Sequence, residues 1–312
     1  MDVRRADGIL GQADRAARSV RMLPPQGALA REMRAIRRAE IFFSTSLAGS
    51  ALGAADVDAL LDRGRAQGDH ALDDYILVRA YAGAADWVAG IRSLPPGDPR
   101  PLISVDELRQ LNARAAAGSN IRAGAWRQSN FAGRAGIVAP AAWLVAREVT
   151  NLVDRVSRGP QATPVAAWLA NFIGRFARLS PFEGANGRTV RLAANLLLRR
   201  LDYPPLVFEA RERKRYPAAL AAAETKQPAR LAALIATAIL RTCDRLGAAA
   251  QPGDDPILPL RDAAGSDYAA LAKAAQRGRL RTLLRGGRYF TTAGWIAEYR
   301  ASRPQGSPKS TR

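Results

Sequence analysis

The strongest constraint on the fold is the helical spacing of apolar residues along most of the chain. Between residues 75 and 93, apolar side chains recur three and four positions apart: Ile76, Leu77, Ala80, Tyr81, Ala84, Trp87, Val88 and Ile91. Such spacing places them on one face of an α-helix. Alanine-rich runs with few β-branched residues favour helices elsewhere as well. We therefore expect an all-α fold.

Turn signals divide the chain into a series of helices. The proline-rich segments 23–27 and 94–101 cannot lie inside helices. Ser104, with Glu107 three positions on, has the pattern of a capping box at a helix start. The patterns predict further helices at residues 141–156, 163–179, 189–201, 216–223 and 228–246.

The 312 residues suffice for one large and one small domain. We expect an N-terminal helical region at 1–100, a core at 101–247, a linker at 248–256, a small module at 257–303 and a tail at 304–312. Residues 124–140 lack helical spacing, and their glycines suit a short β-hairpin flap.

Composition excludes several classes of protein. No stretch is long and apolar enough for a membrane span, and the first residues lead into no apolar signal segment. One cysteine, Cys243, and one histidine, His70, exclude a disulfide framework and a His/Cys zinc site. We expect a cytoplasmic protein with no membrane partner, and export without a cleaved signal stays open.

The net charge of +19 favours an acidic partner. Only four of the 47 basic residues are lysine, so an arginine-biased composition is the alternative explanation. The charge is uneven, however: residues 261–312 hold 11 basic and 3 acidic residues, a balance of +8 in 52 residues. This gradient indicates a nucleic acid partner at the C-terminal end.

A loop of small residues at 180–188 opens onto a predicted helix. Backbone N–H groups at such a helix N-terminus form an anion site. Arg188 and Arg191 lie three positions apart, so both could reach one phosphate chain. An ordinary turn with two solvated arginines is the alternative.

The segment resembles the signature of the Fic (Fido-domain) family, His-x-Phe-x-(Asp/Glu)-(Gly/Ala)-Asn-Gly-Arg-x-x-Arg. The match without gaps comprises Phe182, Ala185, Asn186, Gly187, Arg188 and Arg191. The likeness covers about residues 31–246, including Gly124-Ala125-Trp126-Arg127, the flap at 131–140 and Leu201-Asp202-Tyr203-Pro204-Pro205. It implies an all-α Fic-type core with a hairpin flap.

The resemblance implies a chemistry that this chain departs from. In the family, the motif histidine deprotonates a protein hydroxyl that attacks the α-phosphate of ATP, with Mg²⁺ held by the acidic residue. Ser180 stands at the histidine position, and its hydroxyl cannot act as a base near pH 7. Gly184 takes the acidic position; a local shift would restore Glu183 as the metal ligand, and otherwise Glu183 is a solvated carboxylate.

The resemblance also concerns an inhibitory helix. Family members that carry one have (Ser/Thr)-x-x-x-Glu-(Gly/Asn), whose glutamate pairs with the second motif arginine. Here Ser44, Ala48 and Gly49 fit the frame, with Ala48 at the glutamate position. We therefore expect Arg191 to lack its clamp and to be free for phosphate. A small-residue helix-packing face is the alternative.

The spacing of apolar and turn residues in 257–299 predicts two short helices, a two-stranded wing around Gly286-Gly287 and a final helix. The order resembles the excisionase/MerR-like winged helix-turn-helix, in which the second helix enters the major groove of DNA. The arginines expected to contact DNA are Arg277, Arg279, Arg281, Arg285 and Arg288. A small helical cap with solvated arginines is the alternative.

The leading hypothesis is a degenerate Fic-type regulator that binds DNA and a nucleotide such as ATP. If the nucleotide site is competent to bind, Mg²⁺ is expected to accompany the nucleotide. Its transfer of AMP would be weak or absent. The rivals are an active protein adenylyltransferase that works without the histidine and a scaffold with a vestigial loop. A protein target is expected but not identified by the sequence, and the resemblance makes a homodimer plausible.

Overall fold

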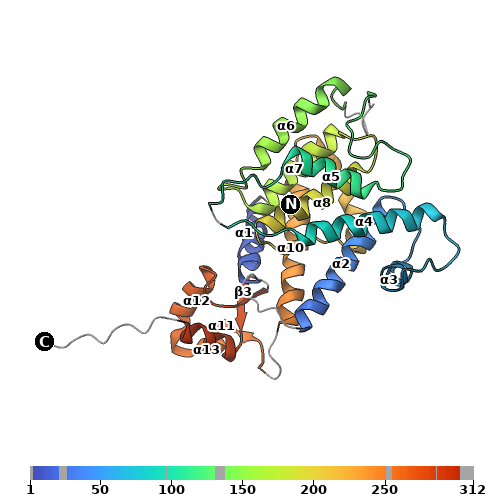
Figure 1. The fold of residues 1–312 in the computed structure, drawn as a ribbon. Helices are drawn as coiled ribbons and strands as arrows, with labels where there is room; N and C mark the ends of the chain where they lie inside the picture. Colours follow the sequence, from blue (N-terminus) through green and yellow to red (C-terminus); the bar gives the residue numbers. More distant parts are fainter. Residues whose placement is uncertain are drawn as a thin grey trace.

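The computed structural model describes residues 3–20, 27–95, 97–130, 138–250, 255–285 and 287–302. The described chain is mostly helical, which confirms the expected fold class (Figure 1). The larger part contains α1 (Val3–Val20), α2 (Gly27–Leu47), α3 (Ala54–Arg63), α4 (Leu72–Gly90), α5 (Val105–Ala115), α6 (Val145–Val156), α7 (Val165–Leu179), α8 (Asn186–Arg200), α9 (Arg215–Glu224) and α10 (Ala229–Ala249).

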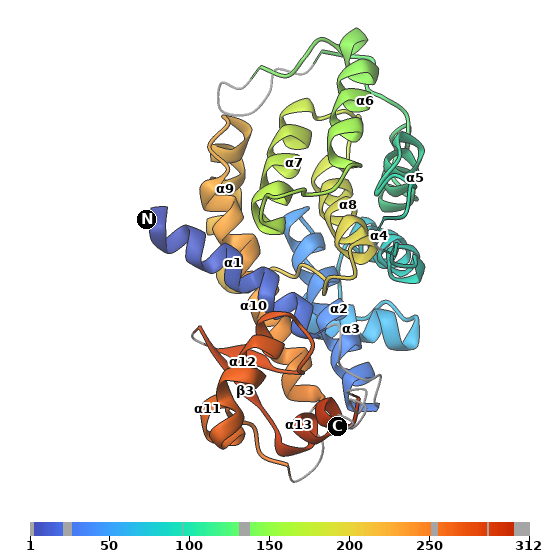
Figure 2. The same cartoon turned by 90° about the vertical axis from the view of Figure 1, so that its left-hand side faces the viewer.

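Helix α8 forms the centre of this part. Residues 189–198 are all buried, so this helix is enclosed on every side rather than on one stripe. It packs against α2, α4, α5 and α7, and Figure 2 shows α7 and α5 on either side of it. The loop that precedes α8 is therefore held by a rigid helix with little freedom to move.

The N-terminal helices belong to the same core. Helix α1 packs along α10 and touches α7, and its Ala13, Ala16 and Ala17 are buried in the main apolar cluster. Helix α2 lies against α4, α8 and α10. The packing therefore runs without a break across residue 100, where the sequence suggested a domain boundary.

The C-terminal module has the predicted order of elements. It consists of β1 (Leu258–Pro259), α11 (Leu260–Ala264), α12 (Tyr268–Gln276), β2 (Leu283–Arg285), β3 (Arg288–Thr291) and α13 (Ala293–Ala301). The strands form an antiparallel sheet in the order β1-β3-β2, in which the third strand, β1, was not predicted. Thr292 caps α13 by accepting a hydrogen bond from the Trp295 backbone.

The module is docked on α1 and α10. Leu283 and Trp295 join Leu246 and Ile36 in one buried apolar cluster. Gly247 is required there, because a Cβ at that position would lie 1.7 Å from a Leu283 methyl group. The hairpin β2–β3 therefore packs on the helices of the larger part.

Two predicted segments cannot be compared in full. The predicted flap includes residues 131–137, which lie outside the described residues, as do 251–254 of the predicted linker and residues 303–312 of the tail. Helix α10 itself continues to Ala249, three residues beyond the predicted end.

Candidate functional site

Ser180 ends α7 and turns its hydroxyl back onto that helix. Its backbone is in the left-handed region, with φ of 40°. Its Oγ donates to the Ala177 carbonyl at 2.7 Å. The hydroxyl at the histidine position of the motif is therefore used to close the helix end.

Asn186 shapes the loop through its own side chain. Its Oδ1 accepts from the Phe182 backbone N–H at 3.0 Å, and its Nδ2 donates to the Phe182 carbonyl at 2.8 Å. The Phe182 ring is 2% exposed and packs 4.9 Å from the Trp126 ring, centroid to centroid. Ala185 precedes α8 with φ of 57°. Phe182, Ala185 and Asn186, which we expected to bind nucleotide, fix the path of the loop.

Asn112 on α5 was not singled out by the sequence, yet it ties three segments together. It is fully buried and donates from Nδ2 to the Gly184 carbonyl and to the Thr189 hydroxyl, each at 3.0 Å. Its Oδ1 accepts from the Gly124 backbone at 2.8 Å. The available signal was a polar residue on the apolar stripe of α5.

Arg127 holds the end of α7 from the other side. Its guanidinium is 3% exposed and donates to the carbonyls of Ser180 at 3.0 Å, Ser129 at 2.8 Å and Pro140 at 2.5 Å. A cation at a helix C-terminus is stabilised by the helix dipole. Burial lowers the pKa of Arg127. This residue of the Gly-x-Trp-Arg segment therefore anchors the loop.

The two motif arginines are both bonded to protein groups. Arg188 donates to the Ala115 carbonyl at the end of α5, at 2.5 Å. Arg191 is 9% exposed and donates to the Ser44 hydroxyl at 2.7 Å and to the Ser44 carbonyl at 2.9 Å. Burial, and then the charge of Arg191, lower the pKa of Arg188. The expectation of a free Arg191 is therefore wrong, because Ser44 clamps it.

Ala48 and Gly49 do not take part in that clamp. Helix α2 ends at Leu47, and both residues are exposed in the turn that follows. Ser44 lies one turn earlier, where the helix still faces α8. Of the three residues expected to mark an inhibitory motif, Ser44 alone contacts Arg191, through neutral oxygens and not through a carboxylate.

Glu183 is exposed and pairs with Arg122 through Nε, at 3.0 Å, and through the terminal nitrogen. This ion pair lowers the pKa of Glu183. Within the described ranges, no group of three His, Cys, Asp or Glu residues could hold a metal ion. Glu183, the carboxylate of this loop, is therefore engaged by a guanidinium.

The lone imidazole is committed elsewhere. His70 lies between α3 and α4, with Nε2 3.3 Å from the Asp56 carboxylate. Its ring also packs at the edge of Tyr75. No part of this contact involves the α7–α8 loop.

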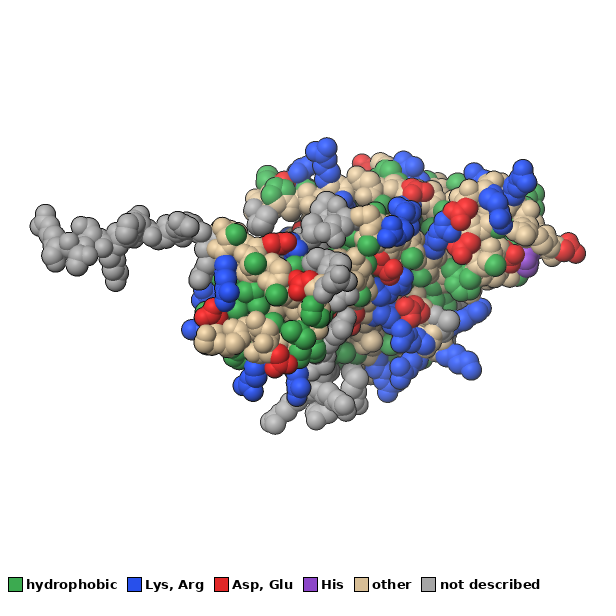
Figure 3. Space-filling model, turned by 90° about the horizontal axis from the view of Figure 1, so that it is seen from below, with side chains coloured by type: hydrophobic (Ala, Val, Ile, Leu, Met, Phe, Trp, Pro, Cys, Tyr) green, Lys and Arg blue, Asp and Glu red, His purple; other side chains and the backbone are tan. Residues whose placement is uncertain are grey.

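The arginines of the C-terminal module differ in their surroundings. Arg277, Arg279 and Arg288 are exposed, while the Arg285 side chain lies outside what the structure describes. Arg281 pairs with Glu298 at 3.1 Å and lies over the Trp295 ring. Seen from below, Lys and Arg side chains on the module alternate with acidic ones (Figure 3). This face is therefore not uniformly basic.

Comparisons with known proteins agree with this geometry. The family model of the Fic/DOC family matches residues 102–198. No curated protein matches the chain. Among the described residues, no helix is long and apolar enough to cross a membrane.

Solved structures extend the likeness beyond the matched segment. A Fic domain containing signaling protein from Bacteroides thetaiotaomicron is 20% identical, with a TM-score of 0.66 over 78% of this chain and 99% of that one. Fic-1 (residues 134–508) from C. elegans is 19% identical, with a TM-score of 0.69 over 78% of this chain and 72% of that one. A Fic family protein from Desulfovibrio desulfuricans is 18% identical, with a TM-score of 0.56 over 87% and 97%. At these identities the structures show a shared fold. Residues 102–198 are therefore a Fic/DOC domain, set within a larger helical fold of the same kind.

Proposed function

We propose that this chain is a degenerate Fic protein that binds a nucleoside triphosphate at the α7–α8 loop and transfers AMP weakly or not at all. The observation that carries the proposal is the state of Ser180, whose hydroxyl donates to Ala177 in place of a histidine. A serine hydroxyl has no pKa near 7, and loss of a positioned general base costs about 10²–10⁴ in rate. The chain's one histidine, His70, is paired with Asp56.

Phosphate binding is supported by the first turn of α8. The 15-residue helix α8 begins at Asn186, and Arg188 and the exposed Gly187 lie in its first turn, where the leading backbone N–H groups favour an anion. Arg191 would join them on leaving Ser44. A polyphosphate offers two guanidiniums stronger acceptors than the neutral carbonyl and hydroxyl oxygens that now hold them.

Magnesium ion is not required by this proposal. Glu183 is the one loop carboxylate near the phosphate position, and Arg122 occupies it. We therefore assign no step to the metal in this chain.

The test measures binding and transfer separately. Calorimetry with ATP gives affinity, and incubation with α-labelled ATP gives transfer to the chain or to proteins of a host lysate. We expect ATP to bind to the wild-type protein, with little labelling. Ser180→His, with Ser180→Ala as the matched control, should raise labelling by about 10²-fold or more, because it restores a base.

Two outcomes would overturn the proposal. Robust labelling by the wild-type protein that is lost in Arg188→Ala would favour the rival, an active adenylyltransferase. No affinity for ATP up to millimolar concentration would favour a scaffold with a vestigial loop.

We propose DNA binding as a second function, on the order of elements in the C-terminal module. The outer side of α12 is exposed, and Arg277 and Arg279 follow it directly. The hairpin is held against α1, because the hydroxyl oxygen of Thr282 lies 3.4 Å from that of Ser19. It is therefore less available to DNA than the sequence led us to expect. The proposed contacts are therefore those of α12 and the exposed Arg288.

Charge reversal tests this better than deletion, because deletion of the module would uncover Ile36 and Leu246, the apolar residues of α2 and α10 that it covers. Fluorescence anisotropy of a labelled DNA duplex should show binding. The logarithm of the association constant should fall linearly with the logarithm of salt concentration, with a slope of about 0.9 for each phosphate contact. Arg277→Glu with Arg279→Glu should weaken binding and reduce that slope by about 2. Arg63→Glu with Arg65→Glu, the same charge change at α3, should retain the slope. Equal effects of both pairs, or no binding at low salt, would refute the second function.

A further inference from the structure

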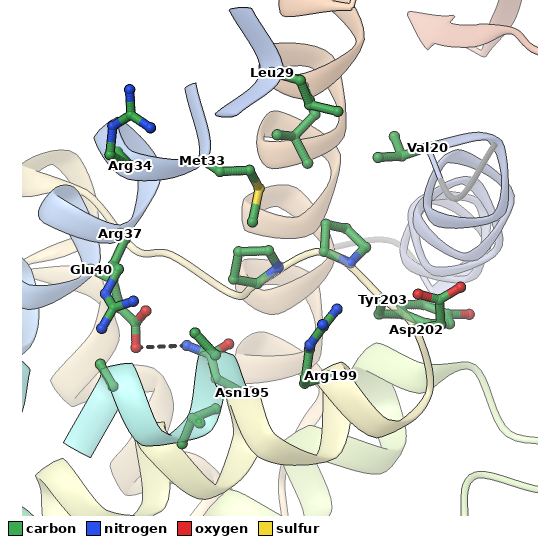
Figure 4. A pocket seen from close by; sticks show the side chains of 16 residues that line it. Val20, Leu29, Met33, Arg34, Arg37, Glu40, Asn195, Arg199, Asp202 and Tyr203 are labelled. Carbon is green, nitrogen blue, oxygen red and sulfur yellow. Dashed lines mark hydrogen bonds between the residues drawn. The ribbon is translucent and has the colours of Figure 1, made fainter. Parts of the chain in front are cut away.

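A pocket separate from the α7–α8 loop lies where α2, α4 and α8 meet α10. Its volume is about 450 Å³, within the range of about 300–1,000 Å³ that is typical of small-molecule sites. Figure 4 shows side chains of α2 and α8 facing each other across it. Neither the family motif nor the DNA-binding proposal uses these residues.

The walls of the pocket are apolar. They are formed by Leu29 and Met33 of α2, Val88 of α4 and the pair Pro204-Pro205 after α8. Met33 is 40% exposed and Figure 4 shows its thioether directed into the space. Methionine adapts its shape to different apolar surfaces. A flat or branched apolar body would therefore be accommodated here.

The carboxylate of Glu40 lies at the floor of the pocket, and one of its oxygens can accept further hydrogen bonds. Glu40 Oε1 accepts from Tyr81 OH at 3.0 Å and from Asn195 Nδ2 at 2.8 Å. Its other oxygen has no hydrogen bond within the described part of the chain. A carboxylate oxygen accepts hydrogen bonds only, so this atom would bind a ligand N–H or O–H group.

Three arginines also line the pocket. Figure 4 shows Arg37 beside Glu40, Arg199 extending from α8 toward the middle of the pocket and Arg34 at the rim. Arg199 donates through Nε to the Ile91 carbonyl at 2.9 Å, which leaves its terminal nitrogens for a ligand. Arg34 has no ion pair or hydrogen bond among the described residues. Guanidiniums bind carboxylate, phosphate and sulfonate groups in a planar, bidentate manner.

From this arrangement we infer a binding site for a small amphipathic organic anion. Its apolar body lies between Met33 and the two prolines, its acidic group lies at Arg199 and Arg34, and a donor group contacts Glu40. The site is separate from the proposed nucleotide site, although Asn195 and Arg191 lie one turn apart on α8. A ligand bound at one of these sites is therefore placed to change the affinity of the other site for its own ligand.

The test uses 8-anilinonaphthalene-1-sulfonate, which combines a naphthalene and a phenyl group with one N–H and one sulfonate. We expect the full chain to bind it with one-to-one stoichiometry, with enhanced fluorescence and a raised melting temperature. Arg199→Ala and Arg34→Ala should each weaken binding about fivefold or more, because each removes a charged hydrogen-bond donor. Arg92→Ala, at an exposed arginine outside the pocket, should leave the affinity unchanged.

Two further comparisons locate the bound probe. Ala89→Phe fills the pocket from an exposed position on α4 and should abolish binding, whereas Ala55→Phe on α3 should not. The uncharged N-phenyl-1-naphthylamine should bind about tenfold less tightly than the sulfonate. Equal binding of both dyes, or equal binding to the Ala89→Phe and wild-type proteins, would overturn the inference, because the probe would then be reporting unspecific apolar surface.

Discussion

Arg191 of α8 is clamped by Ser44 of α2, through its Nε to the hydroxyl at 2.7 Å and through a terminal nitrogen to the carbonyl at 2.9 Å. Both groups of Ser44 accept, so this one residue engages two of the five N–H donors of the guanidinium. The contact joins two positions that are 147 residues apart, and it withdraws an arginine of the Fic motif from the loop.

Removing the hydroxyl should release Arg191 toward phosphate. Ser44→Ala deletes one charged hydrogen bond and leaves the carbonyl in place, so we expect ATP to bind about three- to tenfold more tightly. Calorimetry measures the change. Ser46→Ala, on the same helix but without this contact, is the control and should not alter affinity. An unchanged affinity in Ser44→Ala would mean that Arg191 does not contribute to the nucleotide site.

Arg127 should contribute more to stability than any exposed arginine of the site. Arg127→Met leaves buried carbonyls at the end of α7 without donors, at about 1–3 kcal/mol for each unsatisfied group. We expect the free energy of unfolding to fall by about 2–4 kcal/mol, measured by urea titration. Arg122→Met removes a half-exposed ion pair and should cost less than about 1 kcal/mol. Equal losses in both variants would contradict the anchoring role of Arg127.

Local patterns in the sequence predicted the helices well. The capping box of Ser104 and Glu107 is present, with Glu107 N–H bonded to Ser104 Oγ at 3.1 Å, because both partners lie within one turn. Helix α8 begins at Asn186, three residues before the predicted start, since Asn186 bonds to Phe182 across the loop. Apolar spacing does not record such a side-chain contact.

Contacts between distant segments account for the errors at the site. Arg191 was expected to be free because Ala48 replaces a glutamate, yet the clamp comes from Ser44, one turn earlier. Arg281, an expected DNA contact, is held by Glu298 and Trp295 of α13, partners that the sequence did not indicate. In each case the residue type could be read from the sequence, whereas its partner depends on how the helices pack.

Two helical glycines should respond in opposite directions to the same substitution. A Cβ at Gly174 of α7 would lie 2.7 Å from the Ala223 carbonyl oxygen of α9, so Gly174→Ala must separate two backbones. We expect a loss of about 1–3 kcal/mol in the free energy of unfolding. Gly83 of α4 has nothing within 4 Å of that position, so Gly83→Ala should stabilise by about 0.5–1 kcal/mol through helix propensity. Thermal unfolding followed by circular dichroism separates the two, and destabilisation by both would show that α4 is also tightly packed at Gly83.

The buried carboxyl of Glu40 should give a distinctive pH dependence of stability. Burial raises its pKa above the ordinary value of 4.5, although hydrogen bonds from Asn195 and Tyr81 oppose the shift. Just above pH 4.5 the folded protein therefore keeps a proton that the unfolded chain has released. Stability contributed by this group is highest below pH 4.5 and falls as the pH rises through the folded pKa.

Glu40→Gln retains an acceptor for Asn195 and Tyr81 but cannot ionise. Relative to the wild-type protein, the variant should therefore gain stability between pH 4.5 and neutrality, and melting temperatures across that range measure the gain. Asp14, whose pKa burial also raises, is present in both proteins and cancels in the comparison. Glu183→Gln should show the opposite sign, because Arg122 lowers the pKa of Glu183 and its charged form favours the folded state. A constant difference between Glu40→Gln and wild type at every pH would mean that Glu40 ionises in the folded protein as it does in the unfolded chain, with the charges of Arg37 and Arg191 fully offsetting its burial.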